Sequence, residues 1–475
     1  GLVPGGGADE YKGPFKAGLQ HGYGVCVYAS GARYEGQWLE GKRHGQGELR
    51  EANGSVYRGG FHEGTPAGIG AWHYSDGGLY KGPLVNGLQH GQGEYTAPDG
   101  ARYVGGFVRN QREGQGVFVS GDKSHRYSGG WLANERHGFG STVDRDSIGK
   151  EQLFEGEWRH GVRHGRGKLT TYEGDIYDGE WHNNRRNGIG EERAYNGDVY
   201  IGKWIGGLRW GDGKQTKHTY HGDLFAGMQV YNGLWENGVE HGRGRCSYAD
   251  GTEYAGDWRH GQRHGQGALT AAESGETYEG SWSEGQRLGD GVQVYGNGDV
   301  YRGYWHQDMR SGSGELVTRG GERYDGEWQE NLQHGVGTFM DGNGLVYQGQ
   351  WAEGHRSGEG TCSYANGDVY TGQWQLSVRA GTGKISIKST VEGSLVEVES
   401  YQGMWVGDQQ AGEGKHVTAP PPLGTGETYV GQWIRGMRHG HGRCSYHDGQ
   451  CYVGDWRHGK RQGCGALAHT APAEA

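Results

Sequence analysis

The chain has 475 residues, and its 47 basic and 57 acidic side chains give a formal net charge of −10. Glycine accounts for 102 residues, about three times its usual share, whereas hydrophobic residues reach 32% and aromatic residues 12%. The acidic balance disfavours general nucleic-acid binding, which needs a positive surface, and no apolar run approaches the ~20 residues of a membrane-spanning helix. The aromatic content argues against disorder, so we expect an ordered but thin structure.

Residues 1–10 are interpreted as a lead-in to a repeated pattern. Gly1 is not followed by a charged and then apolar leader, so we expect no secretory signal. From Tyr11 onward the pattern Tyr-x-Gly-x-Trp recurs, most often at intervals of 23 residues. Its starts are Tyr11, Tyr34, Tyr57, Tyr80, Tyr103, Tyr127, Phe154, Tyr177, Tyr200, Tyr231, Tyr254, Tyr278, Tyr301, Tyr324, Tyr347, Tyr370, Tyr401, Tyr429 and Tyr452.

A second pattern, Gly-x-x-His-Gly-x-Gly, follows within each unit, as at 41–47 and 261–267. An Asn-Gly or Asp-Gly pair, such as Asn53-Gly54, then precedes the next tyrosine. These patterns predict one continuous repeat array over 11–468 and a short tail over 469–475. Fixed periods of 20–50 residues are typical of repeat architectures.

Asn-Gly and Asp-Gly tolerate the positive φ angles of type I′ turns, so we expect two antiparallel strands in each repeat. Side chains alternate along a strand, which places the Tyr, Gly and Trp of the first pattern on one face. We expect each aromatic ring to lie across neighbouring glycine backbone. The predicted fold is all-β, an elongated single-layer twisted antiparallel sheet of about nineteen hairpins. One well-preserved repeat illustrates the predicted structural residues, which are Tyr254, Gly256, Trp258, His264, Gly265 and Gly267.

The two patterns together resemble the MORN repeat (membrane occupation and recognition nexus), and the resemblance covers about residues 11–468. It implies the stacked-hairpin fold and a scaffolding role. Arrays made only of such repeats resemble axonemal radial spoke head proteins and cytoskeletal or membrane-junction scaffolds.

Departures from the pattern are the candidate partner-binding positions. Near the N-terminal end, Phe15, Phe61, Leu84 and Phe107 replace tryptophan, which indicates a less uniform aromatic face. Longer units occur at 127–153, 200–230, 370–400 and 401–428. Such interruptions are often tolerated surface insertions, but they are also where an otherwise uniform array can acquire specificity.

The longer units supply the remaining candidates. Alternating residues in 370–400 predict a hairpin longer than the rest, and residues 420–422 predict a stiff extended proline run that could enter an aromatic groove. The candidates here are Trp210, Ile385, Ile387, Leu395, Val398, Pro420, Pro421 and Pro422.

Motifs for catalysis and cofactors are missing from the sequence. There is no Gly-Lys followed by Ser or Thr, no Gly-x-Ser-x-Gly and no His-Glu-x-x-His, so we expect neither an enzyme nor a bound cofactor. The final repeat begins at Tyr452, leaving little room for an appended catalytic domain.

Histidine recurs at one repeat position, including His44, His137, His164 and His264. Equivalent positions in adjacent units should lie ~10 Å apart, too far for two rings to share an ion at ~2.1 Å each. We therefore expect no metal site, and a structural histidine that hydrogen-bonds near the turn. The six cysteines are scattered among mostly distant repeats, which favours reduced thiols and a cytosolic setting.

The leading functional hypothesis is a non-catalytic scaffold of a cytoskeletal assembly, in particular a ciliary or flagellar axoneme. Its expected partners are other proteins of that assembly, with a dimer or a docked neighbour at terminal strand edges. The alternative is a membrane-associated scaffold at a cell cortex or organelle junction. Basic stretches such as Arg159, Arg163, Arg166 and Lys168 could meet anionic headgroups, although acidic residues interleave with them.

Overall fold

The computed structural model describes residues 8–221 and 224–469. Residues 1–7 of the predicted lead-in, 222–223 of the longer unit 200–230, and 470–475 of the predicted tail lie outside the described residues. The chain divides into two compact units, Gly1–Val239 and Glu240–Ala475. The described residues form strands and no helix, which confirms the all-β prediction.

The strands of each unit follow one another in chain order. The first unit contains β1 (Glu10–Lys12), β2 (Phe15–Lys16), β3 (Leu19–Gln20), β4 (Gly22–Val27), β5 (Arg33–Leu39), β6 (Lys42–Arg50), β7 (Val56–His62), β8 (Thr65–His73), β9 (Leu79–Val85), β10 (Leu88–Gln89), β11 (Gly91–Thr96), β12 (Arg102–Val108), β13 (Gln111–Val119), β14 (His125–Leu132), β15 (Glu135–Arg145), β16 (Glu151–Arg159), β17 (Val162–Thr170), β18 (Ile176–His182), β19 (Arg185–Arg193), β20 (Val199–Ile205), β21 (Leu208–His221) and β22 (Leu224–Glu236). The second unit contains β23 (Val239–Ser247), β24 (Glu253–Arg259), β25 (Gln262–Thr270), β26 (Thr277–Ser283), β27 (Gln286–Val294), β28 (Val300–His306), β29 (Met309–Val317), β30 (Arg323–Gln329), β31 (Leu332–Met340), β32 (Val346–Ala352), β33 (His355–Ser363), β34 (Val369–Gln375), β35 (Val378–Val391), β36 (Ser394–Val406), β37 (Gln409–Thr418), β38 (Thr428–Ile434), β39 (Met437–Ser445), β40 (Gln450–Arg457) and β41 (Lys460–His469).

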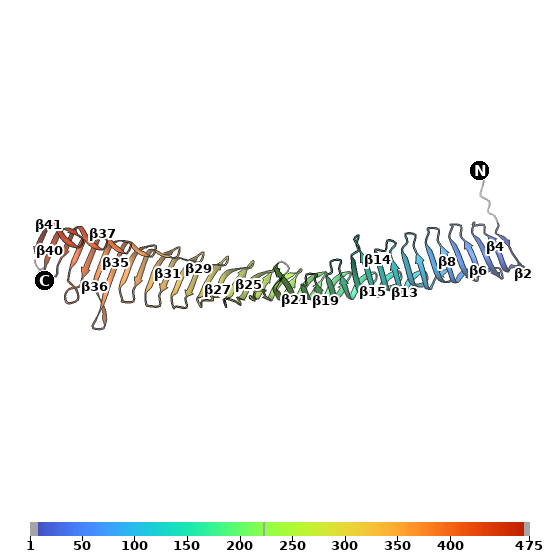
Figure 1. Ribbon diagram of the computed structural model, residues 1–475, viewed down its shortest axis with the longest axis horizontal. Helices are drawn as coiled ribbons and strands as arrows, with labels where there is room; N and C mark the ends of the chain where they lie inside the picture. The colour runs from blue at the N-terminus through green and yellow to red at the C-terminus, as the bar shows by residue number, and fades with distance from the viewer. Residues whose placement is uncertain (1–7, 222–223, 470–475) are drawn as a thin grey trace, which may run out of the picture. The chain divides into compact units, whose positions relative to one another are not determined.

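Apart from β1, which pairs with β4, and the separate pair of β2 and β3, neighbouring strands pair antiparallel in chain order, with β11 also pairing with β9. Each unit is therefore a single layer of stacked hairpins (Figure 1). In the first unit β5 pairs with β4 on one side and β6 on the other. In the second unit β24 pairs in the same way with β23 and β25. The predicted sheet of repeated hairpins is therefore confirmed.

Two different turns alternate along the sheet, and only one of them is the predicted type. The Glu40-Gly41 pair, which follows the tryptophan strand, has φ of 49° and 80°, as a type I′ turn requires. At Asn53-Gly54 only the glycine has a positive φ, of 93°. Instead, Asn53 Oδ1 accepts a hydrogen bond from the Ser55 N–H at 2.8 Å. The prediction of type I′ turns at Asn-Gly pairs was wrong, because the asparagine side chain closes a local turn without entering the left-handed region.

Aromatic rings lie on glycine backbone, as predicted. A Cβ placed on Gly47 would come within 2.5 Å of the Tyr34 hydroxyl oxygen, so only glycine leaves room for the ring. The Tyr34 hydroxyl donates to the Gln37 carbonyl at 2.9 Å, and Trp38 Nε1–H donates to the Gly24 carbonyl at 3.3 Å. Tyr34 is fully buried and Trp38 nearly so. Each ring thus fills the space above its glycine and also satisfies its own polar group.

The repeat around Tyr254 shows the same arrangement in the second unit. Tyr254 and Trp258 are buried, and the ring of Tyr254 covers Gly256 and Gly267. Gly265 has a φ of +60°, a conformation that side chains disfavour.

The longer units extend hairpins beyond the common length. β35 and β36 have 14 and 13 residues, and their tip projects from the sheet (Figure 1). Their pairing shifts register between Ile387 and Lys388. Another long hairpin is formed by β21 and β22, with 14 and 13 residues.

The proline run of 401–428 departs from its prediction. Pro421 and Pro422 lie in a turn rather than in an extended segment. The N–H groups of Leu423 and Gly424 both donate to the Pro420 carbonyl, at 3.1 and 3.3 Å. The chain must reverse between β37 and β38, and the turn that reverses it also contains the prolines.

Candidate interaction face

One face of each unit, which we call the aromatic face, carries the recurring Tyr and Trp side chains. Along it each tyrosine packs edge-on between its own tryptophan and that of the next repeat. Tyr301, for example, has ring centroids 5.1 Å from Trp305 and 5.4 Å from Trp328, with interplanar angles of 88° and 85°. Such edge-to-face pairs add ~0.5–1.5 kcal/mol to the burial of the rings. The face is therefore continuous within each unit and already formed before any partner arrives.

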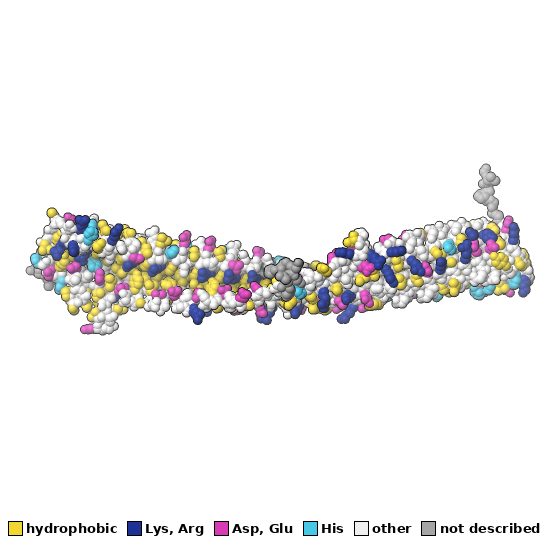
Figure 2. Space-filling model, viewed as in Figure 1, with side chains coloured by type: hydrophobic (Ala, Val, Ile, Leu, Met, Phe, Trp, Pro, Cys, Tyr) yellow, Lys and Arg dark blue, Asp and Glu magenta, His cyan; other side chains and the backbone are white. Residues whose placement is uncertain are grey.

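Arginine side chains lie over these rings, in a row that we call the arginine ladder. The Arg310 guanidinium is 5.6 Å from the Tyr301 centroid and 4.3 Å from that of Trp328, within the range of cation–π attraction. Figure 2 shows hydrophobic side chains gathered along the second unit, with Lys and Arg set among them. The ladder consists of Arg43, Arg112, Arg136, Arg163, Arg186, Arg209, Arg263, Arg287, Arg310, Arg356, Arg379, Arg438 and Arg461.

Burial shapes the electrostatics of the aromatic face. It lowers the pKa of Arg112 and Arg136, because the guanidinium loses water when it lies against rings. It raises the pKa of Tyr278 and Tyr347 to about 12 in each case. The phenols therefore stay neutral and the guanidiniums stay charged at neutral pH, so the ladder presents fixed positive charge.

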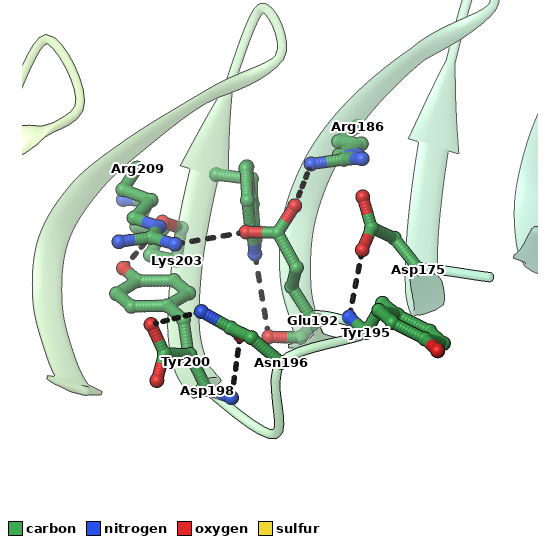
Figure 3. Close-up of polar contacts among 11 residues, drawn as sticks. Asp175, Arg186, Glu192, Tyr195, Asn196, Asp198, Tyr200, Lys203 and Arg209 are labelled. Carbon is green, nitrogen blue, oxygen red and sulfur yellow. Dashed lines mark hydrogen bonds and ion pairs between the residues drawn. The ribbon is translucent and has the colours of Figure 1, made fainter. Parts of the chain in front are cut away.

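Carboxylates link neighbouring members of the ladder in places. Glu192 lies between Arg186 and Arg209 and forms an ion pair with each, at 3.0 Å to Arg209 (Figure 3). Close by, the Tyr200 hydroxyl donates to the Lys203 carbonyl at 3.1 Å. In the second unit Arg287 and Arg379 pair with Asp308 and Asp408, at 2.9 and 3.0 Å. These four members of the ladder therefore already have carboxylate partners within the chain.

The ladder is incomplete in the first unit, and a hollow lies where it is interrupted. This hollow, which we call the Gln89 hollow, has a volume of about 850 Å³ and runs along the turns and strands from Glu51 to Asn134. Smaller hollows of about 370 and 500 Å³ lie beside Arg136 and Arg287, where the ladder is occupied. In the first unit this interruption lies beside open space on the aromatic face. The ladder is also interrupted in the second unit, at Gln333 opposite Trp328 and at Gln410 opposite Trp405.

Comparison with protein families agrees with this geometry. The MORN repeat family matches eighteen segments, which together make up well over half of the chain. The chain belongs to the MORN-repeat family. The matched residues are 11–33, 34–56, 57–79, 80–102, 103–125, 127–147, 154–176, 177–199, 200–219, 231–253, 254–273, 278–300, 301–323, 324–346, 347–369, 401–419, 429–451 and 452–467.

Of the nineteen predicted units, the one that begins at Tyr370 is not among these matches. Its rings nevertheless pack as in the others, with Tyr370 5.1 Å from Trp374 and 5.4 Å from Trp405. Its packing is therefore that of a MORN unit, although its sequence is not matched.

Other comparisons add little to the family assignment. No curated protein matches the chain significantly. A solved structure described as "Streptogramin B lyase structure" is similar at 9% identity, covering 61% of this chain and 88% of that chain with a TM-score of 0.10. At so low a TM-score this similarity says nothing about the fold or function of the chain. Among the described residues, no helix is both long and apolar enough to cross a membrane.

All four residues that replace tryptophan occupy the tryptophan position, but they differ in exposure. Phe61, Leu84 and Phe107 are buried, whereas Phe15 is 61% exposed beside Tyr11. Phe107 also lines the Gln89 hollow. The structure thus uses Phe61, Leu84 and Phe107 as part of the MORN packing.

The candidates in the longer units lie at several distinct places. Trp210 is half-buried in β21, at the repeat position where histidine is common. Ile385 and Ile387 lie half-buried in β35, and Ile385 faces Tyr370 and Tyr401 across the sheet. Leu395 is 55% exposed near the tip of β36.

The remaining candidates of the longer units lie close to one another. Val398 falls at the register shift of β36, and its carbonyl accepts the Ala419 N–H at 2.7 Å. Pro420, Pro421 and Pro422 are exposed in the turn that follows. The base of the long hairpin is thereby tied to the proline turn, and the two form one irregular edge.

The recurring histidines pack in pairs, which the sequence analysis did not anticipate. His164 contacts His182 of the next repeat with centroids 5.0 Å apart, and His137 contacts His160 at 5.6 Å. The Nδ1 atoms of His137 and His164 make no hydrogen bond among the described residues. For these two the expected hydrogen bond near the turn was wrong, because the neighbouring imidazole takes up the space.

In the described part of the chain the cysteines form no disulfide, and no metal-binding cluster is present. All six cysteines are free thiols, and Cys464 alone is exposed. Burial raises the pKa of the Cys362 and Cys444 thiols. Within residues 8–221 and 224–469 no three His, Cys, Asp or Glu side chains are grouped so that they could hold a metal ion.

Proposed function

We propose that this MORN-repeat chain is a non-catalytic scaffold that holds partner proteins along the aromatic faces of its units. The observation that carries the proposal is the arginine ladder over edge-packed Tyr and Trp rings. Tyrosine, tryptophan and arginine are the residues most enriched at protein-binding hot spots. Here the rings are buried and hold the overlying arginines in place, so a partner meets the arginines and little side-chain entropy is lost on binding.

We assign the scaffold to a cytoskeletal assembly in the cytoplasm, specifically a ciliary or flagellar axoneme. The support is the resemblance of repeat-only arrays to radial spoke head proteins. The free, mostly buried thiols are compatible with a reducing compartment.

A strand edge offers a second place for assembly. Among the described residues β41 pairs only with β40, and all ten of its residues are exposed. An open edge of this kind can accept a strand from another chain. We propose that it mediates dimer formation or docking to a neighbouring protein.

The alternative of a membrane-associated scaffold has weaker support. Of the basic residues near 159–168, Arg163 lies over the Phe154 ring at 4.7 Å, where its charge is already engaged. Arg166 and Lys168 are exposed and remain available to anionic headgroups.

Cross-linking mass spectrometry of the full chain in intact cells tests the proposal. We expect cross-links between residues of the aromatic faces and cytoskeletal proteins. Sedimentation with phosphatidylserine vesicles at low salt provides the contrasting measurement. Sedimentation of the purified chain with vesicles, together with cross-links only to membrane proteins, would replace the cytoskeletal assignment with the membrane one.

A further inference from the structure

The arginine ladder skips two consecutive repeats in the first unit. Arg43 pairs in register with Trp38, and the equivalent residues of the next two repeats are Pro66, opposite Phe61, and Gln89, opposite Leu84. The ladder resumes at Arg112. Two places that hold a guanidinium elsewhere therefore hold none here.

The walls at this interruption are unusually aromatic. Trp72 and Tyr95 occupy the strand position that Cys26 and Leu49 fill in the two preceding repeats. Trp72 packs against Tyr57 at 5.3 Å and stacks on Tyr74 at 5.9 Å with an interplanar angle of 10°. Aromatic surface is thus added where the cation is absent, and it lines the Gln89 hollow.

The charge around the hollow is negative. Glu51, Asp76 and Asp99 line it, and none of the three forms a salt bridge with another described residue. Arg112 is the one Lys or Arg among the described lining residues. Burial raises the pKa of Tyr95, and the charges of Asp76 and Asp99 raise it further. Aromatic faces together with unpaired carboxylates form a surface complementary to a cation.

We propose that the Gln89 hollow, where Gln89 stands in place of a ladder guanidinium, binds arginine side chains of an extended partner segment. This deepens the proposed scaffold function and rests on it. Arginine fits better than lysine, because a planar guanidinium stacks on rings and can also bind carboxylates in a bidentate manner.

The repeat geometry sets the spacing of the arginines. Adjacent repeats are two strands apart, or ~10 Å. A polyproline II segment advances ~3.1 Å per residue with three residues per turn, so every third side chain lies on one side at about this spacing. The probe is therefore an end-capped, fluorescein-labelled Gly-Arg-Pro-Pro-Arg-Gly peptide, compared with its glutamine counterpart Gly-Gln-Pro-Pro-Gln-Gly.

Fluorescence anisotropy with the full chain at low salt measures binding of the two peptides. We expect the arginine peptide to bind at least about tenfold more tightly than the glutamine peptide, because both cation–π attraction and charge pairing are lost with glutamine. Equal binding of the two peptides would overturn the proposal.

Gln89→Arg supplies the missing guanidinium from the chain itself. We expect it to weaken peptide binding about tenfold, since the new side chain competes for the same rings. The matched control is Gln333→Arg, which adds the same charge at an equivalent position opposite Trp328 in the second unit. The control should leave affinity unchanged, and an equal loss in both variants would show non-specific attraction and overturn the proposal.

Asp76→Asn with Asp99→Asn tests the carboxylates without removing their turns. Each aspartate Oδ1 accepts a backbone N–H two residues on, from Gly78 at 2.8 Å and from Ala101 at 2.9 Å, and asparagine retains that acceptor. We expect about a tenfold loss of peptide affinity. Asp250→Asn with Asp448→Asn is the control, because these residues make the same turn contact in the second unit.

The outcomes separate this inference from the broader function. Unchanged affinity in both Gln89→Arg and the double asparagine variant overturns the Gln89 hollow as the binding place. If protein cross-links to the aromatic faces persist while the arginine peptide does not bind, only this inference fails. Circular dichroism and thermal unfolding of each variant confirm that a loss of binding is not a loss of folding.

Discussion

Glycine and tyrosine work as a pair in this chain, because the ring occupies the space that a side chain on the glycine would need. The pairing of Tyr254 with Gly267 is representative, and the Tyr254 hydroxyl also donates to the Asp257 carbonyl at 2.9 Å. The described strands form a single layer in each unit, so these rings are its core. Glycine abundance is therefore a requirement of packing here, rather than a sign of flexibility.

Replacing Gly267 with alanine should destabilise the second unit. The new Cβ would lie 2.5 Å from the Tyr254 Cζ, so the ring or the strand must move, at a cost of ~1–3 kcal/mol. Urea unfolding followed by tryptophan fluorescence measures the change. Gly320→Ala is the control, because its nearest atom would be Thr318 Oγ1 at 3.6 Å, and it should unfold at the wild-type urea concentration.

Tyrosine ionisation should unfold the sheet in alkaline solution. Burial raises the pKa of Tyr278 and Tyr347 from 10.0 to about 12, so the unfolded chain loses these protons first. The stabilisation is complete below pH ~10 and is lost as the pH rises toward ~12. Spectrophotometric titration with circular dichroism should show tyrosinate appearing together with loss of the strand signal. Tyrosinate formation well before that loss would contradict the burial argument.

At the scale of the hairpin, the chain reverses through two turn types that alternate along the sheet. The tight turns after the tryptophan strands carry two residues with positive φ, as at Glu284 (49°) and Gly285 (83°). Glutamate is poorly suited to that conformation, which costs most L-residues ~1–2 kcal/mol. The backbone is therefore strained at Glu284, and because this residue is exposed, a substitution there can relieve the strain.

Glu284→Asn should stabilise the hairpin of β26 and β27 by ~0.5–1 kcal/mol, because asparagine tolerates the left-handed region. The expected result is a higher urea midpoint with an unchanged slope. Glu273→Asn serves for comparison, since Glu273 is in a turn where only Gly275 has a positive φ, and it should give no gain. A lower midpoint for Glu284→Asn would mean that the glutamate has a role beyond the turn.

The hairpins and the aromatic face were predictable from the sequence, because Tyr, Gly and Trp recur with the alternation of a strand. The arginine ladder was missed. Arg263, Arg287 and Arg310 share one repeat position that could have been noticed, but the closer of the two rings beneath each belongs to the following repeat. The Gln89 hollow also could not be predicted from the sequence, since it lies where two consecutive repeats lack the arginine of the ladder. Phe107 was singled out as a departure, but not for the space beside it.

At the scale of the whole molecule, each repeat contacts mainly its two neighbours. Tyr324 illustrates this, with Trp328 of its own repeat at 5.1 Å and Trp351 of the next at 5.2 Å. In such arrays stability is close to a sum of repeat and nearest-neighbour terms. Damage at one place should therefore remain local.

Hydrogen exchange of Gly267→Ala tests that locality. We expect faster exchange in β24, β25 and β26 and wild-type protection two or more repeats away, since cooperative opening follows the contacts. Mass spectrometry of peptides along the full chain gives the profile. A uniform rise in exchange across the second unit would indicate instead that the unit opens as a single cooperative block.

The tyrosine that bridges two successive indoles also bears on how such a gene can change. Since Tyr301 meets one indole within its own repeat and another just beyond it, an in-frame copy of codons 301–323 would present borders that its new neighbours already match. Unequal recombination can add or delete whole periods of this kind without creating a mismatched seam. Evolution can therefore change the number of repeats one at a time, while the hydrogen-bonding and ring contacts of every retained repeat stay as they were.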